Sequence, residues 1–173
     1  CNMVVDHEKG AVDLYLDRVE KELAMVTKLI GTGRHAVQFH WGGGTPNFLN
    51  EKQTERALKM FREAFAFQPG AEVSLEIDPR IATPEQAAFF KSVGFNRISM
   101  GVQDFDVAVQ KAIGRNQGRE RTLGVYQGCR DAGFEGVNID LVYGLPGQTS
   151  ATFQNTLREI IALEPDRVAC FSY

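Results

Sequence analysis

The run Trp41-Gly42-Gly43-Gly44-Thr45-Pro46 follows directly on a short alternating segment, Val37-Gln38-Phe39-His40-Trp41. Consecutive glycines at the end of a predicted strand expose backbone amides without any Cβ, so a small polar ligand can approach the chain closely. No Gly-Lys-Ser/Thr follows, and the glycine spacing differs from that of the dinucleotide-binding fingerprint. The run therefore predicts a ligand site at the rim of a sheet and disfavours a phosphate cradle.

The composition limits the class of protein. With 173 residues, of which 43% are hydrophobic, the chain can bury one hydrophobic core. Its net charge of -3 provides no basic surface, so we expect no nucleic-acid partner. No apolar run is long enough to cross a bilayer and no secretory signal is visible, so we expect no membrane partner and a cytoplasmic location. Cys1, Cys129 and Cys170 lie far apart and provide no disulfide framework.

Segments of helical and strand periodicity alternate along the chain, which is typical of repeated βα units. Strands are predicted at residues 37–41, 72–78, 96–101, 137–142 and 167–172. Helices are predicted at residues 10–30, 51–65, 83–94, 106–132 with an interruption at 114–118, and 149–163. This alternation suits a barrel wall or an open doubly wound sheet, and in both folds the ligand lies beyond the carboxyl ends of the strands.

Polar residues at these strand ends are the candidate ligand contacts: residues 42–44, Glu76 with Asp78, Gln103 with Asp104, and Asp140. Glu76 and Asp78 share one face of a strand, where a carboxylate either contacts a ligand or faces solvent or a cation. Asp140 ends an apolar strand, where a charge needs a partner, so we expect a ligand or an ion pair there. His40 alternates with aromatic residues and is expected to be a neutral, hydrogen-bonded histidine.

Five motifs occur in the order and approximate spacing of the oxygen-independent coproporphyrinogen III oxidases: Cys1-Asn2, residues 41–46, residues 76–80, residues 100–105 and residues 138–146. On this resemblance, which spans essentially the whole chain, the protein is identified as a member of the radical S-adenosylmethionine (SAM) superfamily. The resemblance implies an α/β fold, a partial (βα)6 radical SAM barrel in which residues 1–173 form one radical SAM core domain. The chain starts without an initiator methionine, and we expect it to be a piece of a longer protein that lacks the first strand and the cluster-binding loop.

The resemblance also implies two cofactors, SAM and a [4Fe–4S] cluster. In this family the loop after the first strand carries a Cys-x-x-x-Cys-x-x-Cys motif whose thiolates hold the cluster. Cys1-Asn2 resembles the tail of that motif, and Cys1 then corresponds to a fourth cysteine that does not bind the cluster. We therefore expect the cluster ligands upstream of Cys1, no metal ligand in this chain, and no activity from this piece alone.

SAM contacts follow from the same resemblance. It places Gly43, Gly44 and Thr45 against SAM and adds four further contacts, namely Glu76, Gln103, Arg115 and Asp140. For the groups at strand ends the residue chemistry agrees, because an amino acid and a ribose need backbone donors, carboxylates for ammonium or hydroxyl groups, and an arginine for the carboxylate. Arg115 by itself would be read as a surface arginine.

The implied reaction converts coproporphyrinogen III into protoporphyrinogen IX by oxidative decarboxylation of two propionates to vinyl groups. It implies an electron donor and an electron acceptor as partners, and it needs no catalytic side chain from this chain, since the cofactors carry the chemistry. Two alternatives remain. Haem chaperones share the radical SAM core, although they usually lack the forms seen at Cys1-Asn2, residues 78–80 and residues 102–105. A generic βα-barrel enzyme for a phosphate or sugar lacks a basic anion site here.

Overall fold

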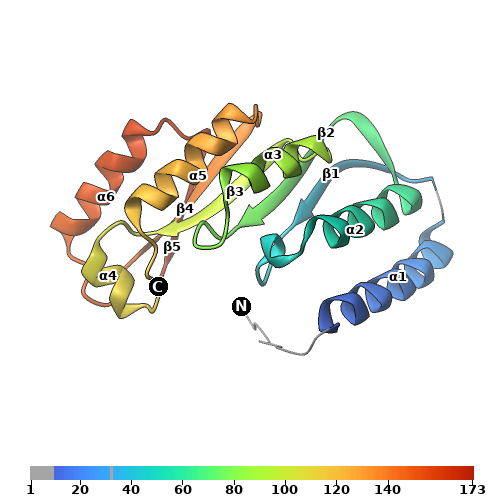
Figure 1. The fold of residues 1–173 in the computed structure, drawn as a ribbon, viewed down its shortest axis with the longest axis horizontal. Helices are drawn as coiled ribbons and strands as arrows, with labels where there is room; N and C mark the ends of the chain where they lie inside the picture. Colours follow the sequence, from blue (N-terminus) through green and yellow to red (C-terminus); the bar gives the residue numbers. More distant parts are fainter. Residues whose placement is uncertain (1–9, 32) are drawn as a thin grey trace.

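The structure is a computed structural model that describes residues 10–31 and 33–173 (Figure 1). Cys1, Asn2 and His7 lie outside the described residues. Its strands are β1 (His35–Trp41), β2 (Ala66–Ile77), β3 (Arg97–Gln103), β4 (Gly136–Tyr143) and β5 (Arg167–Ser172). Its helices are α1 (Ala11–Ile30), α2 (Glu51–Ala64), α3 (Pro84–Ser92), α4 (Val107–Ala112), α5 (Arg119–Asp131) and α6 (Ser150–Ala162), with a short 3-10 helix, η1 (Pro46–Phe48).

The strands form one sheet in the order β1-β2-β3-β4-β5, and every neighbouring pair is parallel. Figure 1 shows a curved sheet with α2, α3, α5 and α6 following one another along one side. This architecture is a half-barrel, which confirms the predicted α/β fold. All five predicted strands and their connecting helices are present, and the predicted interruption separates α4 from α5.

Strand β2 starts earlier than predicted, at Ala66 instead of Glu72. The pairing with β1 shifts here, because Ala36 pairs with Phe67 while Gln38 pairs with Glu72. The intervening Pro69-Gly70 looks like a turn in the sequence, and Gly70 does have a left-handed φ of 78°. The structure accommodates this segment as an irregularity within the strand, so the predicted strand begins too late.

The helix-facing side of the sheet forms the main core. Leu75, Ile98, Met100 and Leu141 are fully buried there, together with residues from the covering helices. This confirms the predicted alternation along β2, where Leu75 faces the helices and Glu76 faces the inside of the half-barrel. The inward positions are therefore available for polar groups.

The inner face carries a polar ladder near the amino ends of the strands. Gln38 Nε2 donates to Glu72 Oε1 at 3.0 Å, and Arg97 Nε donates to Glu72 Oε2 at 2.9 Å. Arg97 Nη1 also donates to Asn138 Oδ1 at 3.2 Å, so the ladder joins β1 to β4. Burial by itself would raise the pKa of Glu72, but the hydrogen bond from Gln38 and the charge of Arg97 outweigh burial and lower it. The strands are thus cross-linked below the position where a ligand would bind.

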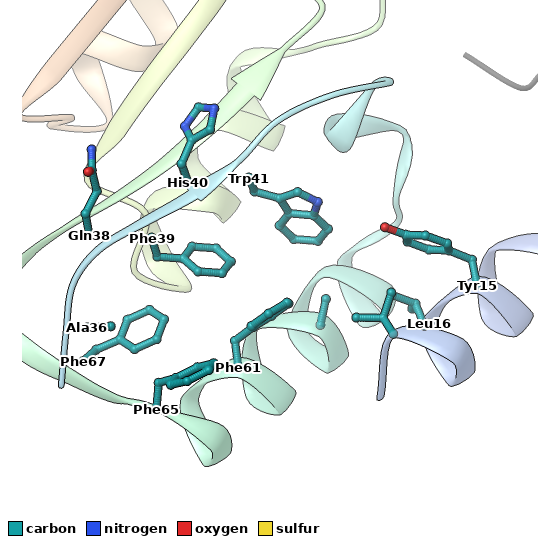
Figure 2. Close-up of a pocket in the computed structure, with 12 residues that line it drawn as sticks. Tyr15, Leu16, Ala36, Gln38, Phe39, His40, Trp41, Phe61, Phe65 and Phe67 are labelled. Atoms are coloured by element: carbon teal, nitrogen blue, oxygen red, sulfur yellow. The ribbon is translucent and has the colours of Figure 1, made fainter. Parts of the chain in front are cut away.

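Helix α2 was predicted to bury one apolar face, and this prediction is only partly correct. Leu58 is buried, whereas Phe61 and Phe65 are half-buried. These two rings line an apolar pocket of about 450 Å³ between α1, β1 and α2, opposite Tyr15 and Leu16 of α1 (Figure 2). They are not fully buried because α1 packs against α2 and leaves space beside β1.

Candidate functional site

A polar cleft of about 290 Å³ opens at the carboxyl ends of β2, β3 and β4. Its walls come from the glycine run, from three strand ends and from the loop between α4 and α5. The lining residues are Gly44, Thr45, Pro46, Glu76, Ile77, Asp78, Arg80, Ser99, Gly101, Gln103, Arg115 and Asp140. Six of the seven predicted SAM contacts lie in this set, and the seventh, Gly43, is hydrogen-bonded to Glu76. The structure thus brings the sequence-predicted site residues together.

The glycine run needs glycine for two different reasons. Gly43 and Gly44 have left-handed φ angles of 81° and 63°, which side chains rarely adopt. Gly42 instead leaves room for its neighbours: a Cβ there would lie 2.5 Å from Glu76 Oε1 and 2.6 Å from His40 Nε2, so these two side chains would have to shift. A Cβ on Gly43 or Gly44 would meet no atom within 4 Å, so their outer side is open to a ligand.

Asn47, which the sequence reading missed, anchors the glycine run to β2. Its buried side chain accepts a hydrogen bond from Asp78 N at 2.9 Å and donates to Asp78 O at 3.3 Å. Gln86 Nε2 holds the same segment by donating to Asn47 O at 3.0 Å. The only signal in the sequence was the position of Asn47 directly after Thr45-Pro46.

Glu76 is held by two neighbouring groups. Its Oε2 accepts from the amide of Gly43 at 3.0 Å, and its Oε1 lies 3.2 Å from His40 Nε2. His40 Nδ1 lies 2.8 Å from Ser74 Oγ, so His40 is a hydrogen-bonded histidine as predicted. Figure 2 shows His40 on the opposite side of β1 from Phe39 and Trp41. The Glu76 side chain keeps 42% of its surface exposed, which leaves its carboxylate accessible to a ligand.

Asp140 is half-buried on the inner face of β4. Ser99 Oγ lies 3.1 Å from both carboxylate oxygens, and among the ion pairs of the described residues none includes Asp140. Burial is the main cause of its raised pKa, and the nearby Glu76 adds to it, against the hydrogen bond from Ser99 and the charges of His40 and Arg115. Of the two expected partners, an ion pair is therefore not what holds Asp140, and a carboxylate that accepts from one hydroxyl retains capacity to accept from a ligand.

Arg115 is held in the cleft by neutral acceptors. Its Nη2 donates to Gly101 O at 2.8 Å, and its Nε donates to Gln117 Oε1 at 3.0 Å. A Cβ on Gly101 would lie 3.0 Å from Arg115 Nη2, so glycine allows this close approach. Burial is the main influence on Arg115 and lowers its pKa, although the charges of Asp78 and Asp140 act in the opposite direction.

The carboxylate of Asp78 is held by Arg80. Arg80 Nη2 donates to Asp78 Oδ2 at 2.6 Å, Arg80 Nε reaches both oxygens at 3.0 Å, and Arg115 Nη2 lies 3.7 Å from Oδ1. Burial would raise the pKa of Asp78, but the hydrogen bonds from Arg80 and the charge of Arg115 outweigh it and lower the pKa. Of the two roles open to this carboxylate, the structure shows pairing with a cation.

The side chains of Gln103 and Asp104 point to different places at the end of β3. Gln103 lines the cleft and has a left-handed φ of 68°, at the point where the pairing between β3 and β4 shifts. Asp104 is fully buried instead, and accepts from Thr156 Oγ1 and Gln148 Nε2, both at 2.5 Å. The expectation that Asp104 is a ligand contact is therefore wrong, because the turn at Gln103 directs the next side chain into the protein.

The cleft residues fit SAM but do not supply a cluster. Glu76, Asp140 and Arg115 offer acceptors and a cation for an amino acid and hydroxyl groups, beside an open stretch of backbone. Within residues 10–31 and 33–173, no group of three or more His, Cys, Asp or Glu side chains could hold a metal ion. Burial raises the pKa of Cys129 to about 12, and Cys170 lies exposed elsewhere. These cysteines therefore do not fit a [4Fe–4S] cluster.

A parallel half-barrel with a polar cleft at the carboxyl ends of its strands defines a class of βα-barrel proteins that bind their ligands there. The sequence profile of the radical SAM superfamily matches residues 6–160, and the chain belongs to that superfamily. Within it, the chain is similar over all 173 residues to the oxygen-independent coproporphyrinogen III oxidases of Escherichia coli K12 and of Synechocystis, each at 43% identity.

The solved structure of the coproporphyrinogen III oxidase of Escherichia coli, described as a radical SAM enzyme, covers the entire chain with a TM-score of 0.93 and 42% identity. Elp3 of Methanocaldococcus infernus matches 89% of the chain with a TM-score of 0.66 and 18% identity, which shows the fold alone. The chain spans only 38% of the length of the Escherichia coli relative. These matches confirm the predicted superfamily and the predicted partial barrel.

In the part of the chain that the structure describes, no helix combines the length and the apolar character needed to span a membrane.

Proposed function

We propose that the protein containing this chain is an oxygen-independent coproporphyrinogen III oxidase, which converts coproporphyrinogen III into protoporphyrinogen IX. The observation that carries the proposal is the match to the Escherichia coli oxidase, which extends over every residue of the chain and includes the fold around the cleft. The same resemblance supports the reading of residues 1–173 as one radical SAM core domain.

The cleft is the proposed SAM site, with Gly43, Gly44 and Thr45 beside the methionine end. Arg115 would pair with the carboxylate of SAM, while Glu76 and Asp140 would accept hydrogen bonds from its ammonium or hydroxyl groups. Gln103 would add a neutral amide. SAM and a [4Fe–4S] cluster, when bound, supply the radical chemistry that oxidises the propionate side chains of the substrate.

The residues of this chain would bind SAM, orient it in the cleft and shield it from water. The neutral acceptors around Arg115 leave its charge available to an anion, and the hydrogen bond from Gly43 fixes the direction of Glu76. No side chain in the cleft has to act as a nucleophile. Cluster ligands, an electron donor and an electron acceptor are further parts of the proposal, and so is a cytoplasmic location with no nucleic-acid or membrane partner.

Anaerobic incubation of the full-length protein with SAM, a reductant and coproporphyrinogen III tests the proposal. We expect a product in which two propionates have become vinyl groups, detected by mass spectrometry. The matched control omits SAM and should leave the substrate unchanged. Tight haem binding without turnover would overturn the proposal in favour of a haem chaperone.

A further inference from the structure

A chain of buried amides leads from the core to the cleft. Gln117 is almost completely buried, with 1% of its surface exposed, and so is Thr122. Gln117 Oε1 accepts from Arg115 Nε at 3.0 Å, and Gln117 Nε2 donates to Thr122 Oγ1 at 3.1 Å. Because Gln117 uses both ends of its amide, the side chain has one defined orientation, with its oxygen toward Arg115.

The backbone of Gln117 is also held by a buried side-chain amide, that of Gln110. Gln110 Oε1 accepts from Gln117 N at 3.1 Å, and Gln110 Nε2 donates to Asp104 O at 2.7 Å. Asp104 is fixed in turn, because its buried carboxylate accepts from Thr156 and Gln148. The position of Gln117 is therefore determined by Asp104 just after β3, Gln110 on α4 and Thr156 on α6, none of which lines the cleft.

Two anchors fix the plane of the Arg115 guanidinium. One is Gln117 Oε1 on Nε, and the other is Gly101 O on Nη2. A guanidinium carries its donors in a rigid plane, so two such contacts determine where the remaining donors point. Both anchors are uncharged, and the nearest carboxylate, that of Asp78, lies 3.7 Å away and already pairs with Arg80.

We propose that Gln117 is a positioning residue for SAM binding: it orients Arg115 in the cleft without neutralising its charge. This inference rests on the proposed function, because it assumes that Arg115 binds the carboxylate of SAM. A glutamine suits the role better than a glutamate. A carboxylate at residue 117 would hold the same N–H but would also compete with an anionic ligand for the positive charge.

The test measures SAM affinity by calorimetry, and unfolding by denaturant, in the reconstituted full-length protein. The variants are Gln117→Leu, Arg115→Leu and their double variant. We expect Gln117→Leu to weaken SAM binding about tenfold, the size of one lost hydrogen bond to a charged group. The double variant should bind no more weakly than Arg115→Leu alone, because Gln117 acts through Arg115. Independent losses that multiply in the double variant would overturn the inference.

Tyr126→Phe is the matched control, since Tyr126 lies on α5 and donates from a largely buried hydroxyl to Leu163 O at 2.8 Å. It should lower stability without changing SAM affinity.

A second variant covers the case in which Gln117→Leu does not fold. Gln117→Glu keeps the acceptor, and we expect it also to weaken SAM binding. Wild-type affinity in that variant overturns the inference. If Arg115→Leu binds SAM normally, the proposed site fails. If Arg115→Leu weakens binding and Gln117→Leu does not, only the positioning role fails.

Discussion

The backbone amide of Gly43 donates a 3.0 Å hydrogen bond to the carboxylate of Glu76, which lies 33 residues further along the chain. This contact joins the glycine run to the carboxyl end of β2 and fixes one wall of the cleft. The nearby His40 fixes the other oxygen of Glu76. Backbone and carboxylate are therefore arranged for a ligand by the fold itself.

Gly43→Val in the full-length protein should weaken SAM binding severely. The new side chain would enter the open space beside Gly43, and its backbone would have to keep a φ of 81°. A left-handed conformation costs a residue with a side chain about 1–2 kcal/mol, so some stability is lost as well. Gly70→Val is the control, because Gly70 has a φ of 78° and equally open surroundings outside the cleft. Equal SAM affinity in the two variants would refute the assignment.

Asp140→Asn should lower SAM affinity by about 1.5–3 kcal/mol, the range for a charge-assisted hydrogen bond, while stability changes little. No ion pair of the described residues includes Asp140, so the substitution leaves no cation without a partner. Calorimetry and denaturant unfolding on the same protein samples separate the two effects. A large loss of stability with normal SAM affinity would show that Asp140 is structural.

The pH dependence of Asp140→Asn follows from the raised pKa of Asp140. The folded state binds this proton more tightly than the unfolded state, so the carboxyl adds stability at low pH and loses it as the pH rises through the folded pKa. At neutral pH the variant should therefore be as stable as the wild type or more stable. This advantage should shrink as the pH falls toward the ordinary pKa of aspartate, which denaturant unfolding across pH can measure.

Asp78→Asn should behave in the opposite way. The pKa of Asp78 is lowered, so its contribution to stability is present above the unfolded pKa and is lost as the pH falls through the folded pKa. We expect the variant to lose about 1 kcal/mol at neutral pH, because Arg80 loses its charged partner but is exposed enough for water to offset part of the loss. The loss should diminish in acid. A variant as stable as the wild type at neutral pH would show that the pair with Arg80 is unimportant.

Gln103→Gly and Gln103→Ala should separate strain from binding. The left-handed backbone at Gln103 favours glycine over alanine by about 1 kcal/mol, so the glycine variant should be the more stable of the two. Both variants lose the amide that lines the cleft and should bind SAM more weakly than the wild type. Urea unfolding and SAM titration measure the two quantities. An alanine variant at least as stable as the glycine variant would contradict the strained conformation.

Local sequence signals predicted the alternating βα units and the strand-end part of the cleft, whereas the choice of a partial barrel over an open sheet came from the family resemblance. Glycine runs and carboxylates at strand ends are recognised from the adjacent strand pattern. Gly43, Glu76 and Asp140 could therefore be predicted from the sequence pattern. Arg115 came only from the family resemblance, because it reaches the cleft from a loop between two helices. Asn47 and Gln117 were missed, since their roles depend on hydrogen bonds to residues that the fold brings close.

The fate of Asp104 illustrates the same limit. Gln103 and Asp104 are adjacent in sequence, and both follow an apolar strand. Only the left-handed backbone at Gln103 decides that one side chain enters the cleft and the other enters the core. Glutamine gives no sequence signal for that conformation, which is usual for glycine and uncommon for other residues.

A crystal structure of the full-length protein with SAM bound would locate the ligand relative to the cleft. We expect SAM in the cleft, with Arg115 at its carboxylate and with Glu76, Gln103 and Asp140 within hydrogen-bond distance of its polar groups. SAM bound elsewhere, or bound in the cleft without contact to these side chains, would show that the cleft is not the SAM site proposed for these residues.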